Sequence, residues 1–162
     1  MKAKLANALS FSDVISAVEN FMPEVNIVAI PDGIKIYGVD TAKVAFISIF
    51  LPSSYFQEYS IEGEKELIGV KVGDLSDILK RADKEDELEI NNKENKLMIK
   101  FNGNLERKFV LPLLSLEEGR EPTLNFQFSY RAKMTTNNFA EALDVLSEIG
   151  GCLLYTSDAA DE

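Results

Sequence analysis

Amphipathic segments recur in this sequence at a fixed interval. Three segments carry apolar residues at positions i, i+3, i+4 and i+7, and they begin at Phe11, Leu75 and Phe139, so that both intervals are 64 residues. This spacing predicts three helices, each with one apolar stripe. The third position of each segment is acidic as well. A repeat of this length indicates a structural unit that occurs more than once.

Strand-like runs surround these helices in a constant order. The runs KAKLANA, ELIGVKV and FSYRAKM precede the three helices, and three further strand candidates follow each of the first two. We therefore expect a β-α-β-β-β unit that is present twice in full and begins a third time. Such units predict an α+β fold in which each helical stripe is buried on an antiparallel sheet and the opposite helix faces are exposed in a row. The alternative is a chance alignment, because any two amphipathic helices can be superposed.

Turn residues divide the strand candidates into hairpins. Pro31 to Ile34 links two apolar runs, and a second hairpin is expected to turn within Asn91 to Asn95. Asn102-Gly103 has the composition of a two-residue hairpin turn, because both residues tolerate positive φ. The run Val44 to Leu51 is apolar at nearly every residue, so we expect a buried strand that ends at Pro52.

The composition limits the class of protein. The 162 residues, 46% apolar and 27% charged, suit one ordinary domain or two small ones. No run approaches the roughly 18 apolar residues that span a bilayer. The start of the chain lacks the apolar core of a secretory signal, so we expect a cytoplasmic protein with no membrane partner.

The sequence contains no histidine and one cysteine, which excludes ordinary triad hydrolysis, histidine-rich zinc sites and an intramolecular disulfide. The net charge of -10 argues against tight binding of nucleic acid.

Two long stretches resemble a known family. DGIKIYGVDTAKVAFISIFLPSSYF and LIGVKVGDLSDILKRADKEDELEI are similar to the archaeal and eukaryotic DNA sliding clamp, the proliferating cell nuclear antigen (PCNA) family. The resemblance covers about Met1 to Gly151, and MKAK and FLPSSYF most resemble one subunit type of the heterotrimeric clamps of thermoacidophilic archaea. It implies a DNA-clamp fold of four such units per subunit, with helices lining a bore and antiparallel sheets outside. Four units need roughly 256 residues, which implies an incomplete second domain.

The same resemblance implies a function without catalysis, cofactor or metal. Clamps of this family are processivity factors that form trimeric rings around double-stranded DNA. They tether a DNA polymerase, a flap nuclease, a DNA ligase and other replication and repair enzymes after a clamp loader has placed the ring. For this chain we expect a heterotrimer with other clamp subunits. We also expect weak, topological, sequence-independent binding of DNA in the archaeal cytosol, at the nucleoid.

The resemblance divides the chain into four parts. We expect clamp domain 1 with two repeats in residues 1–112, an interdomain connector in 113–124, the beginning of clamp domain 2 in 125–151, and a non-native tail in 152–162. The tail, CLLYTSDAADE, resembles the conceptual translation of a transposase-type sequencing adapter and lacks the turn and alternation expected there. The alternative is a genuine, divergent C-terminus.

Basic residues gather on the exposed face of the second predicted helix. Lys80 and Arg81 match basic bore residues of the family, and helical geometry adds Lys84 to the same face. A sliding clamp needs diffuse attraction to phosphates rather than base contacts. The alternative is a solvated helix face whose cations suit the helix dipole. The exposed faces of the other two helices carry no cation, so we expect this subunit to contribute weakly to DNA contact.

A client-peptide groove is implied beside the run Ile34 to Val39. The matching positions are Val39, Lys43, Val44 and Phe46, with Pro122 and Leu124 from the connector. An apolar anchor often dominates binding in such a pocket, which makes Phe46 the first residue to mutate. The alternative is that Val44 and Phe46 are core residues of a buried strand.

Two edge strands are implied as well. ERKFVLPLL matches the strand that pairs head to tail with the next subunit, so the expected interface residues are Arg107, Lys108, Phe109, Val110 and Leu111. ELIGVKV matches the edge that pairs with the second domain of the same subunit. We expect both edges to be open in this chain and to invite aggregation.

Two other classes remain open at this point. One is a carboxylate-metal enzyme that uses the acidic turn RADKEDELE. In this turn Asp83, Glu85 and Glu87 alternate as in a calcium loop, but the glycine that such a loop needs is absent. The other is a free-standing protein-interaction module that never encircles DNA.

Overall fold

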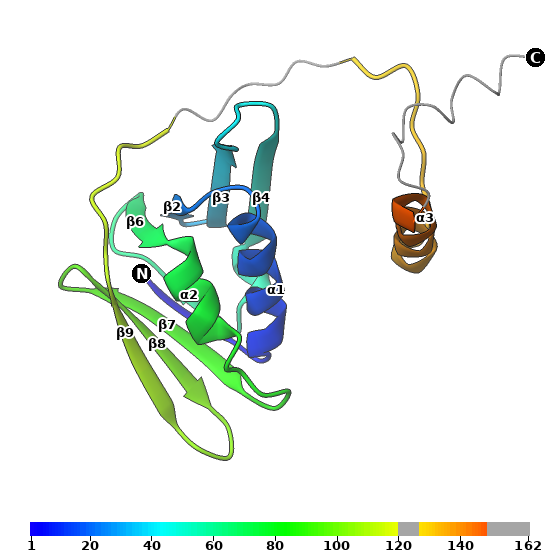
Figure 1. The fold of residues 1–162 in the computed structure, drawn as a ribbon. Helices are drawn as coiled ribbons and strands as arrows, with labels where there is room; N and C mark the ends of the chain where they lie inside the picture. The colour runs from blue at the N-terminus through cyan, green and yellow to red at the C-terminus, as the bar shows by residue number, and fades with distance from the viewer. Residues whose placement is uncertain (120–126, 149–162) are drawn as a thin grey trace, which may run out of the picture. The chain divides into compact units, whose positions relative to one another are not determined.

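The computed structural model describes residues 1–119 and 127–148, and the chain separates into two compact units. The first unit is Met1–Pro122 and the second is Thr123–Glu162. Among the described residues, the first unit holds two α-helices and all of the strands, and the second holds one helix (Figure 1).

Both complete repeats form in the first unit. The first repeat consists of β1 (Lys2–Leu5), α1 (Ala8–Glu19), β2 (Glu24–Ile30), β3 (Gly33–Val39) and β4 (Phe46–Pro52). The second consists of β6 (Glu66–Lys71), α2 (Val72–Leu79), β7 (Glu87–Lys93), β8 (Lys96–Asn102) and β9 (Arg107–Pro112). A short 3-10 helix, η1 (Ser53–Tyr55), and a short strand, β5 (Glu58–Ser60), lie between the repeats. The predicted β-α-β-β-β order and the α+β class are confirmed.

The first strand of each repeat pairs within the sheet of the other repeat. β1 lies between β5 and β7 in a five-stranded sheet of order β5-β1-β7-β8-β9. β6 lies beside β2 in a four-stranded sheet of order β4-β3-β2-β6. All pairs are antiparallel, with Ala3 opposite Ile90 in the first sheet and Val25 opposite Val70 in the second. Neither repeat therefore completes its sheet without the other.

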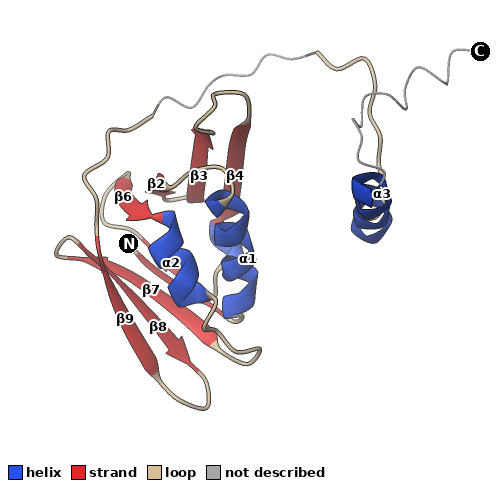
Figure 2. Ribbon diagram, viewed as in Figure 1, coloured by secondary structure: helices blue, strands red, loops and turns tan. Residues whose placement is uncertain are grey.

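α1 and α2 share one apolar core with the two sheets. The helical stripes are buried as predicted, with Phe11, Ile15 and Val18 from α1 and Leu75 and Leu79 from α2. The strands add inward-facing side chains at alternate positions, among them Ile34, Ile36, Leu97, Ile99 and Phe101. Burying each such side chain contributes about 1.5–3 kcal/mol. α1 and α2 pack side by side against the sheets, which leaves their opposite faces exposed together (Figures 1 and 2).

Local hydrogen bonds define the ends of these helices. α1 begins after Asn7, whose side-chain oxygen accepts the N–H of Leu9 at 2.8 Å, as an N-cap residue should. α2 has Asp74 in its first turn, where a negative charge suits the helix dipole, and it ends at Leu79. The second helix is therefore shorter than the run of apolar periodicity, which extends to Ala82.

One predicted strand has a different environment from the expected one. β4 lies at the edge of the four-stranded sheet, and Leu51 is the only buried residue of its seven. Val44 precedes the strand and is 84% exposed, while Phe50 within it is 50% exposed. The prediction of a buried strand is wrong, because an apolar run does not by itself distinguish a central strand from an edge strand.

Two of the three predicted hairpins turn where expected. Pro31 and Asp32 connect β2 to β3, and Gly33 follows with φ +147; a Cβ there would lie 2.1 Å from a backbone oxygen of β4. The turn from β7 to β8 is made by Glu94 and Asn95, both with positive φ, inside the expected segment.

The third hairpin is different. Four residues, 103–106, separate β8 from β9, and Asn102-Gly103 does not form a two-residue turn because neither residue has positive φ. Gly103 lies instead against the carboxylate of Asp86, where a Cβ would be 2.0 Å from Oδ1. The glycine is required here for close approach and not for turn geometry.

The second unit contains α3 (Thr136–Glu148). Within this unit the apolar stripe is not covered, and Phe139 is 49% exposed. The run Phe128 to Met134 before the helix is not a strand, contrary to the prediction. A strand needs a neighbour for its backbone N–H and C=O groups, and no other strand of the described residues lies in this unit.

Candidate functional site

The predicted DNA-facing cations lie where α2 ends. The Lys80 N–H donates to the Ser76 carbonyl oxygen at 2.8 Å and closes the helix at Leu79. Lys80, Arg81 and Lys84 are all exposed. The placement of Lys84 on the helix is wrong, because the chain leaves the helix at Lys80 and Lys84 lies in the turn before β7.

Lys80 forms an ion pair with α1. Its Nζ lies 3.0 Å from Oε2 of Glu19, and the Ser76 hydroxyl donates to the same oxygen at 2.7 Å. The Ser76 hydroxyl, and then the Lys80 ammonium, lower the pKa of Glu19. The side chain of Lys80 is 52% exposed, so water screens the pair and the ammonium stays accessible. This helix face therefore offers less net positive charge than the sequence suggests.

The other helices add no cations to this surface. Neither α1 nor α3 contains lysine or arginine. The exposed residues of α1 include Asp13 and Ala17, and Asn20 follows at its end. The positive charge beside the helices of the first unit therefore lies at the two ends of α2, with Lys71 at its beginning and the predicted cations at its end.

The predicted groove residues of the first unit lie beside the outer face of the four-stranded sheet. Val39 and Phe46 are opposite each other at the ends of β3 and β4, and Val39 is 46% exposed while Phe46 is half-buried. Lys43 and Val44 lie in the loop between these strands. Because Val44 is 84% exposed, the alternative that it is a core residue is wrong.

The loop that presents Val44 is ordered by one carboxylate. Oδ1 of Asp40 accepts the N–H groups of Val44 at 2.7 Å and Ala45 at 2.8 Å. The hydrogen bond from Ala45 lowers the pKa of Asp40. Lys43 takes φ 59, a left-handed conformation that sharpens the turn. An apolar side chain is thus held in water by a rigid loop.

The connector runs along the same sheet. The Leu114 N–H donates to the Gly69 carbonyl oxygen on β6 at 2.8 Å, and Asn26 Nδ2 donates to the Glu117 carbonyl oxygen at 3.0 Å. The Tyr37 hydroxyl donates to the Gly119 carbonyl oxygen at 3.1 Å. Asn26 and Tyr37 are positioning residues that our sequence analysis did not identify. Pro122 and Leu124 lie outside the described residues.

β9 forms an edge of the five-stranded sheet, as the interface prediction requires. Its side chains alternate, with Lys108, Val110 and Pro112 exposed and Arg107, Phe109 and Leu111 half-buried. The exposed set and the free backbone edge are available to a further strand. Arg107 instead turns beneath the end of α2, where it binds Asp86.

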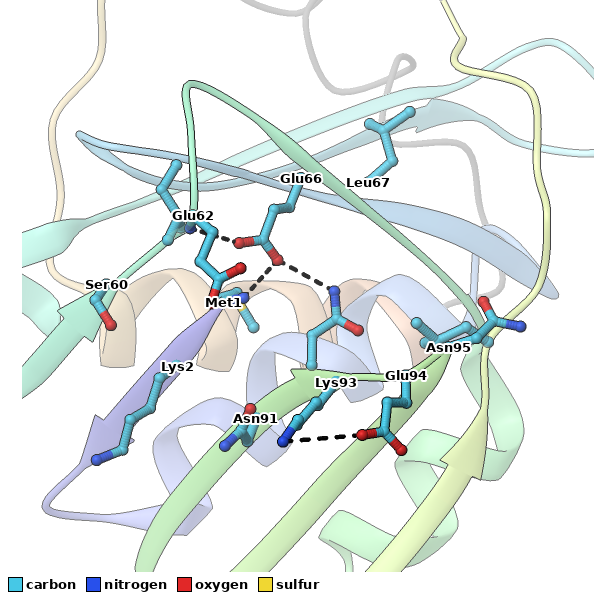
Figure 3. Close-up of a pocket in the computed structure, with 13 residues that line it drawn as sticks. Met1, Lys2, Ser60, Glu62, Glu66, Leu67, Asn91, Lys93, Glu94 and Asn95 are labelled. Atoms are coloured by element: carbon cyan, nitrogen blue, oxygen red, sulfur yellow. Dashed lines mark hydrogen bonds and ion pairs between the residues drawn. The ribbon is translucent and has the colours of Figure 1, made fainter.

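A polar cavity surrounds the N-terminus (Figure 3). The Met1 ammonium and the Asn92 side-chain amide, at 3.1 Å, both donate to Oε2 of Glu66, and the Glu62 N–H donates to Oε1 at 2.9 Å. Burial raises the pKa of Glu66, but these hydrogen bonds outweigh burial and lower it overall. The contact joins β1 in one sheet to β6 in the other. No motif in the sequence signals it.

The acidic turn does not assemble a metal site. Asp83 and Asp86 both bind Arg107, and within residues 1–119 and 127–148 no group of three or more His, Cys, Asp or Glu side chains could hold a metal ion. In the same residues, no helix is both long and apolar enough to cross a membrane.

Comparison with known proteins agrees with this architecture. Residues 1–121 match the family described as the N-terminal domain of proliferating cell nuclear antigen. The chain belongs to the PCNA family. This confirms the resemblance read from the sequence and, with it, the expected clamp fold.

Archaeal PCNA proteins match most of the chain. It is 42% identical to DNA polymerase sliding clamp 2 of Saccharolobus solfataricus over 153 residues, which are 94% of this chain and 62% of that protein. It is 37% identical to the clamp 2 protein of Sulfolobus acidocaldarius over 151 residues, 93% of this chain and 61% of that protein. A crystal structure of a PCNA2-PCNA3 complex from Sulfolobus tokodaii matches with a TM-score of 0.88 at 36% identity, covering 93% of this chain and 61% of that chain. The chain therefore spans about three fifths of the length of these relatives.

The PCNA match and the first compact unit nearly coincide. The match ends at residue 121 and the unit ends at Pro122. The predicted segments 113–124 and 125–151 lie partly outside the described residues, and the predicted tail, 152–162, lies wholly outside them.

Proposed function

We propose that this chain is part of a sliding-clamp subunit, which contributes to a ring around double-stranded DNA and tethers replication and repair enzymes to it. The observation that carries this proposal is the pairing of α1 and α2 over two antiparallel sheets in a chain whose first 121 residues match the PCNA N-terminal domain. The function is mechanical, because a ring that holds an enzyme on DNA needs no reacting group of its own. The relatives' name, DNA polymerase sliding clamp, supports this role.

In this proposal the exposed helix faces line the bore. Lys80, Arg81 and Lys84 attract phosphates through water and read no bases, which leaves the ring free to move along the duplex. These cations gather at the C-terminal end of α2, where Lys80 pairs with Glu19, and exposed Lys71 lies at the other end of the helix. Lys80, Arg81 and Lys84 can make at most three phosphate contacts. A plot of the logarithm of the DNA-binding constant against the logarithm of the salt concentration should therefore have a slope of about -3 or shallower. Partner subunits then supply much of the contact with DNA.

Ring assembly uses the edge of β9. A strand of a neighbouring clamp subunit adds to this edge head to tail and covers Lys108 and Val110, so that a trimeric ring closes without an exposed edge. A ring of different subunits suits this subunit, because its own surface offers few cations for contact with DNA. The PCNA2-PCNA3 complex among the solved structures supports pairing between different subunits.

Client enzymes bind the outer face of the four-stranded sheet. Val39, Val44 and Phe46 receive an apolar plug from an extended peptide of a DNA polymerase, a flap nuclease or a DNA ligase, beside the connector that Asn26 and Tyr37 hold in place. A clamp loader acts on the same ring before the clients bind. The location that fits this work is the archaeal cytosol, at the nucleoid.

Loading on nicked circular DNA tests the proposal. A subunit of the full length of the relatives, with this sequence as its N-terminal part, is combined with purified partner clamp subunits, a clamp loader and ATP, and DNA-bound protein is separated by gel filtration. We expect this subunit to be retained on circles and released when the circle is cut once. Binding that is indifferent to this cut contradicts a clamp and favours a free-standing interaction module.

A further inference from the structure

A buried ion pair holds the turn that follows α2. Asp86 is 2% exposed, and its Oδ2 binds Nη2 of Arg107 and accepts the N–H of Asp83 at 2.7 Å. Nη1 of Arg107 donates to the carbonyl oxygen of Arg81 at 2.6 Å. One guanidinium from β9 therefore ties the beginning of the turn to its end.

The guanidinium is itself held in one orientation. Its Cζ lies 5.3 Å from the centroid of the Phe101 ring, and Phe101 is opposite Arg107 on β8. Both Nη atoms donate their hydrogen bonds to the turn, while Nε is buried without a hydrogen-bond partner in the described part of the chain. A planar fork can reach both Arg81 and Asp86, whereas the single ammonium of lysine cannot hold both acceptors in this geometry.

Gly103 provides the space for this pair. A Cβ at residue 103 would lie 2.0 Å from Oδ1 of Asp86. A larger residue at this position would therefore displace the carboxylate from its place beside Arg107. Three parts of the chain, the turn, β9 and the loop before it, meet at one buried aspartate.

We propose that Arg107 and Asp86 are positioning residues that hold Lys80, Arg81 and Lys84 in place for contact with DNA. This inference rests on the proposed function of those cations. The last carbonyl oxygens of α2 accept the N–H groups of Lys80, Arg81 and Ala82, and among the described residues the turn after Ala82 receives no further hydrogen bond from the helix. The bridge from Arg107 and Asp86 supports the chain from there to β7 and keeps the basic side chains from dispersing. Arg107 also begins β9, so the strand proposed for subunit pairing and the turn proposed for DNA contact share one side chain.

Amide hydrogen exchange and a duplex titration of the 15N-labelled chain test this inference. In Arg107→Lys, which keeps the charge, we expect exchange of the amides of residues 81–86 to rise about tenfold while the sheets keep their protection. We also expect duplex-induced shifts at Lys80, Arg81 and Lys84 to shrink. Lys93→Met, at an exposed lysine of the same sheet that belongs to none of the proposed binding surfaces, is the control and should leave both readouts unchanged.

A second variant perturbs the pair without changing any charge. Gly103→Ala displaces Asp86, and we expect the same local rise in exchange. The inference is overturned if turn exchange is unchanged in the folded variants, or if exchange rises equally throughout the chain. If the Arg107→Lys variant does not fold, amide exchange in the Gly103→Ala variant alone tests whether the Arg107–Asp86 pair holds the turn. Absence of duplex-induced shifts in the unmodified chain would contradict the proposed role of Lys80, Arg81 and Lys84 in DNA contact, whereas the exchange data judge the Arg107–Asp86 link separately.

Discussion

At the scale of single residues, Glu66 joins the two sheets through hydrogen bonds rather than packing. Its carboxylate accepts hydrogen bonds from the Met1 ammonium, which precedes β1, and from the side-chain amide of Asn92 on β7, although Glu66 itself lies on β6. The hydrogen bonds lower its pKa from an ordinary value of 4.5. A lowered pKa means that the folded state holds the charged form more tightly than the unfolded state does.

This predicts a dependence of stability on pH. The contribution of Glu66 is complete above pH 4.5 and is lost as the pH falls through the lower pKa of the folded state. Glu66→Gln should lower the free energy of unfolding by about 1–3 kcal/mol at neutral pH, because hydrogen bonds to a charged group are lost. Urea unfolding of the variant should also show a weaker decline between neutral and acid pH.

The control for this prediction is Glu64→Gln. Glu64 is exposed in the loop before β6, so its substitution should leave both the stability and its pH dependence unchanged. Equal acid sensitivity in the Glu66 variant and the unmodified chain would show that Glu66 is not the group responsible.

At the scale of elements, β4 is a long edge strand with apolar side chains on both faces. Phe50 lies opposite Lys35 on the outer face and is 50% exposed, whereas Ile49 lies opposite Ile36 and packs against the core. An uncharged apolar edge is a template for pairing with other chains. The neighbouring positions 49 and 50 therefore have different roles, although both are large and apolar.

Phe50→Glu should reduce aggregation and change stability little. The new carboxylate faces Lys35 across the strand pair, and surface substitutions usually stay within about 0.5 kcal/mol. Light scattering during incubation at high protein concentration measures the effect. Ile49→Glu is the matched comparison, and it should unfold the protein because it brings an unpaired charge to the core. If both variants behave alike, the assignment of the two faces is wrong.

At the scale of the whole molecule, the exchange of β1 and β6 makes the two repeats interdependent. β1 pairs with β7 of the second repeat, and β6 pairs with β2 of the first. Each repeat alone would leave a sheet edge and part of the core uncovered. Folding of the first unit therefore requires both repeats at once.

Fragment complementation tests this interdependence. Residues 1–62 and 63–122 should each show weak strand signals in circular dichroism and no cooperative unfolding. An equimolar mixture should recover the strand signal and a thermal transition, since the strand exchange needs no covalent link between the halves. Cooperative unfolding of residues 1–62 alone would contradict it.

The local periodicities were sufficient to predict the repeat and the helical stripes, because they depend on residues close together in the chain. The family was identified separately, from the resemblance of two long stretches of sequence. Phe11 and Leu75 are buried where the stripe places them, and the turn at Glu94 and Asn95 lies in the predicted segment. The family resemblance and the fold class could therefore be predicted from the sequence alone. Among the site residues, the exposure of Lys80 and Arg81 could also be predicted from the local sequence pattern.

Contacts between distant residues decided the rest. The sequence contains no signal that β1 joins the other repeat's sheet, that β4 is an edge, or that FSYRAKM lacks a partner strand, because strand pairing depends on what lies alongside in space. Lys84 lies outside the predicted helix, in a turn that contains Asp86 and is bound by Arg107 from the more distant β9. Lys80 was recognisable as a basic residue in the sequence, but only the packing of α1 against α2 placed Glu19 beside it.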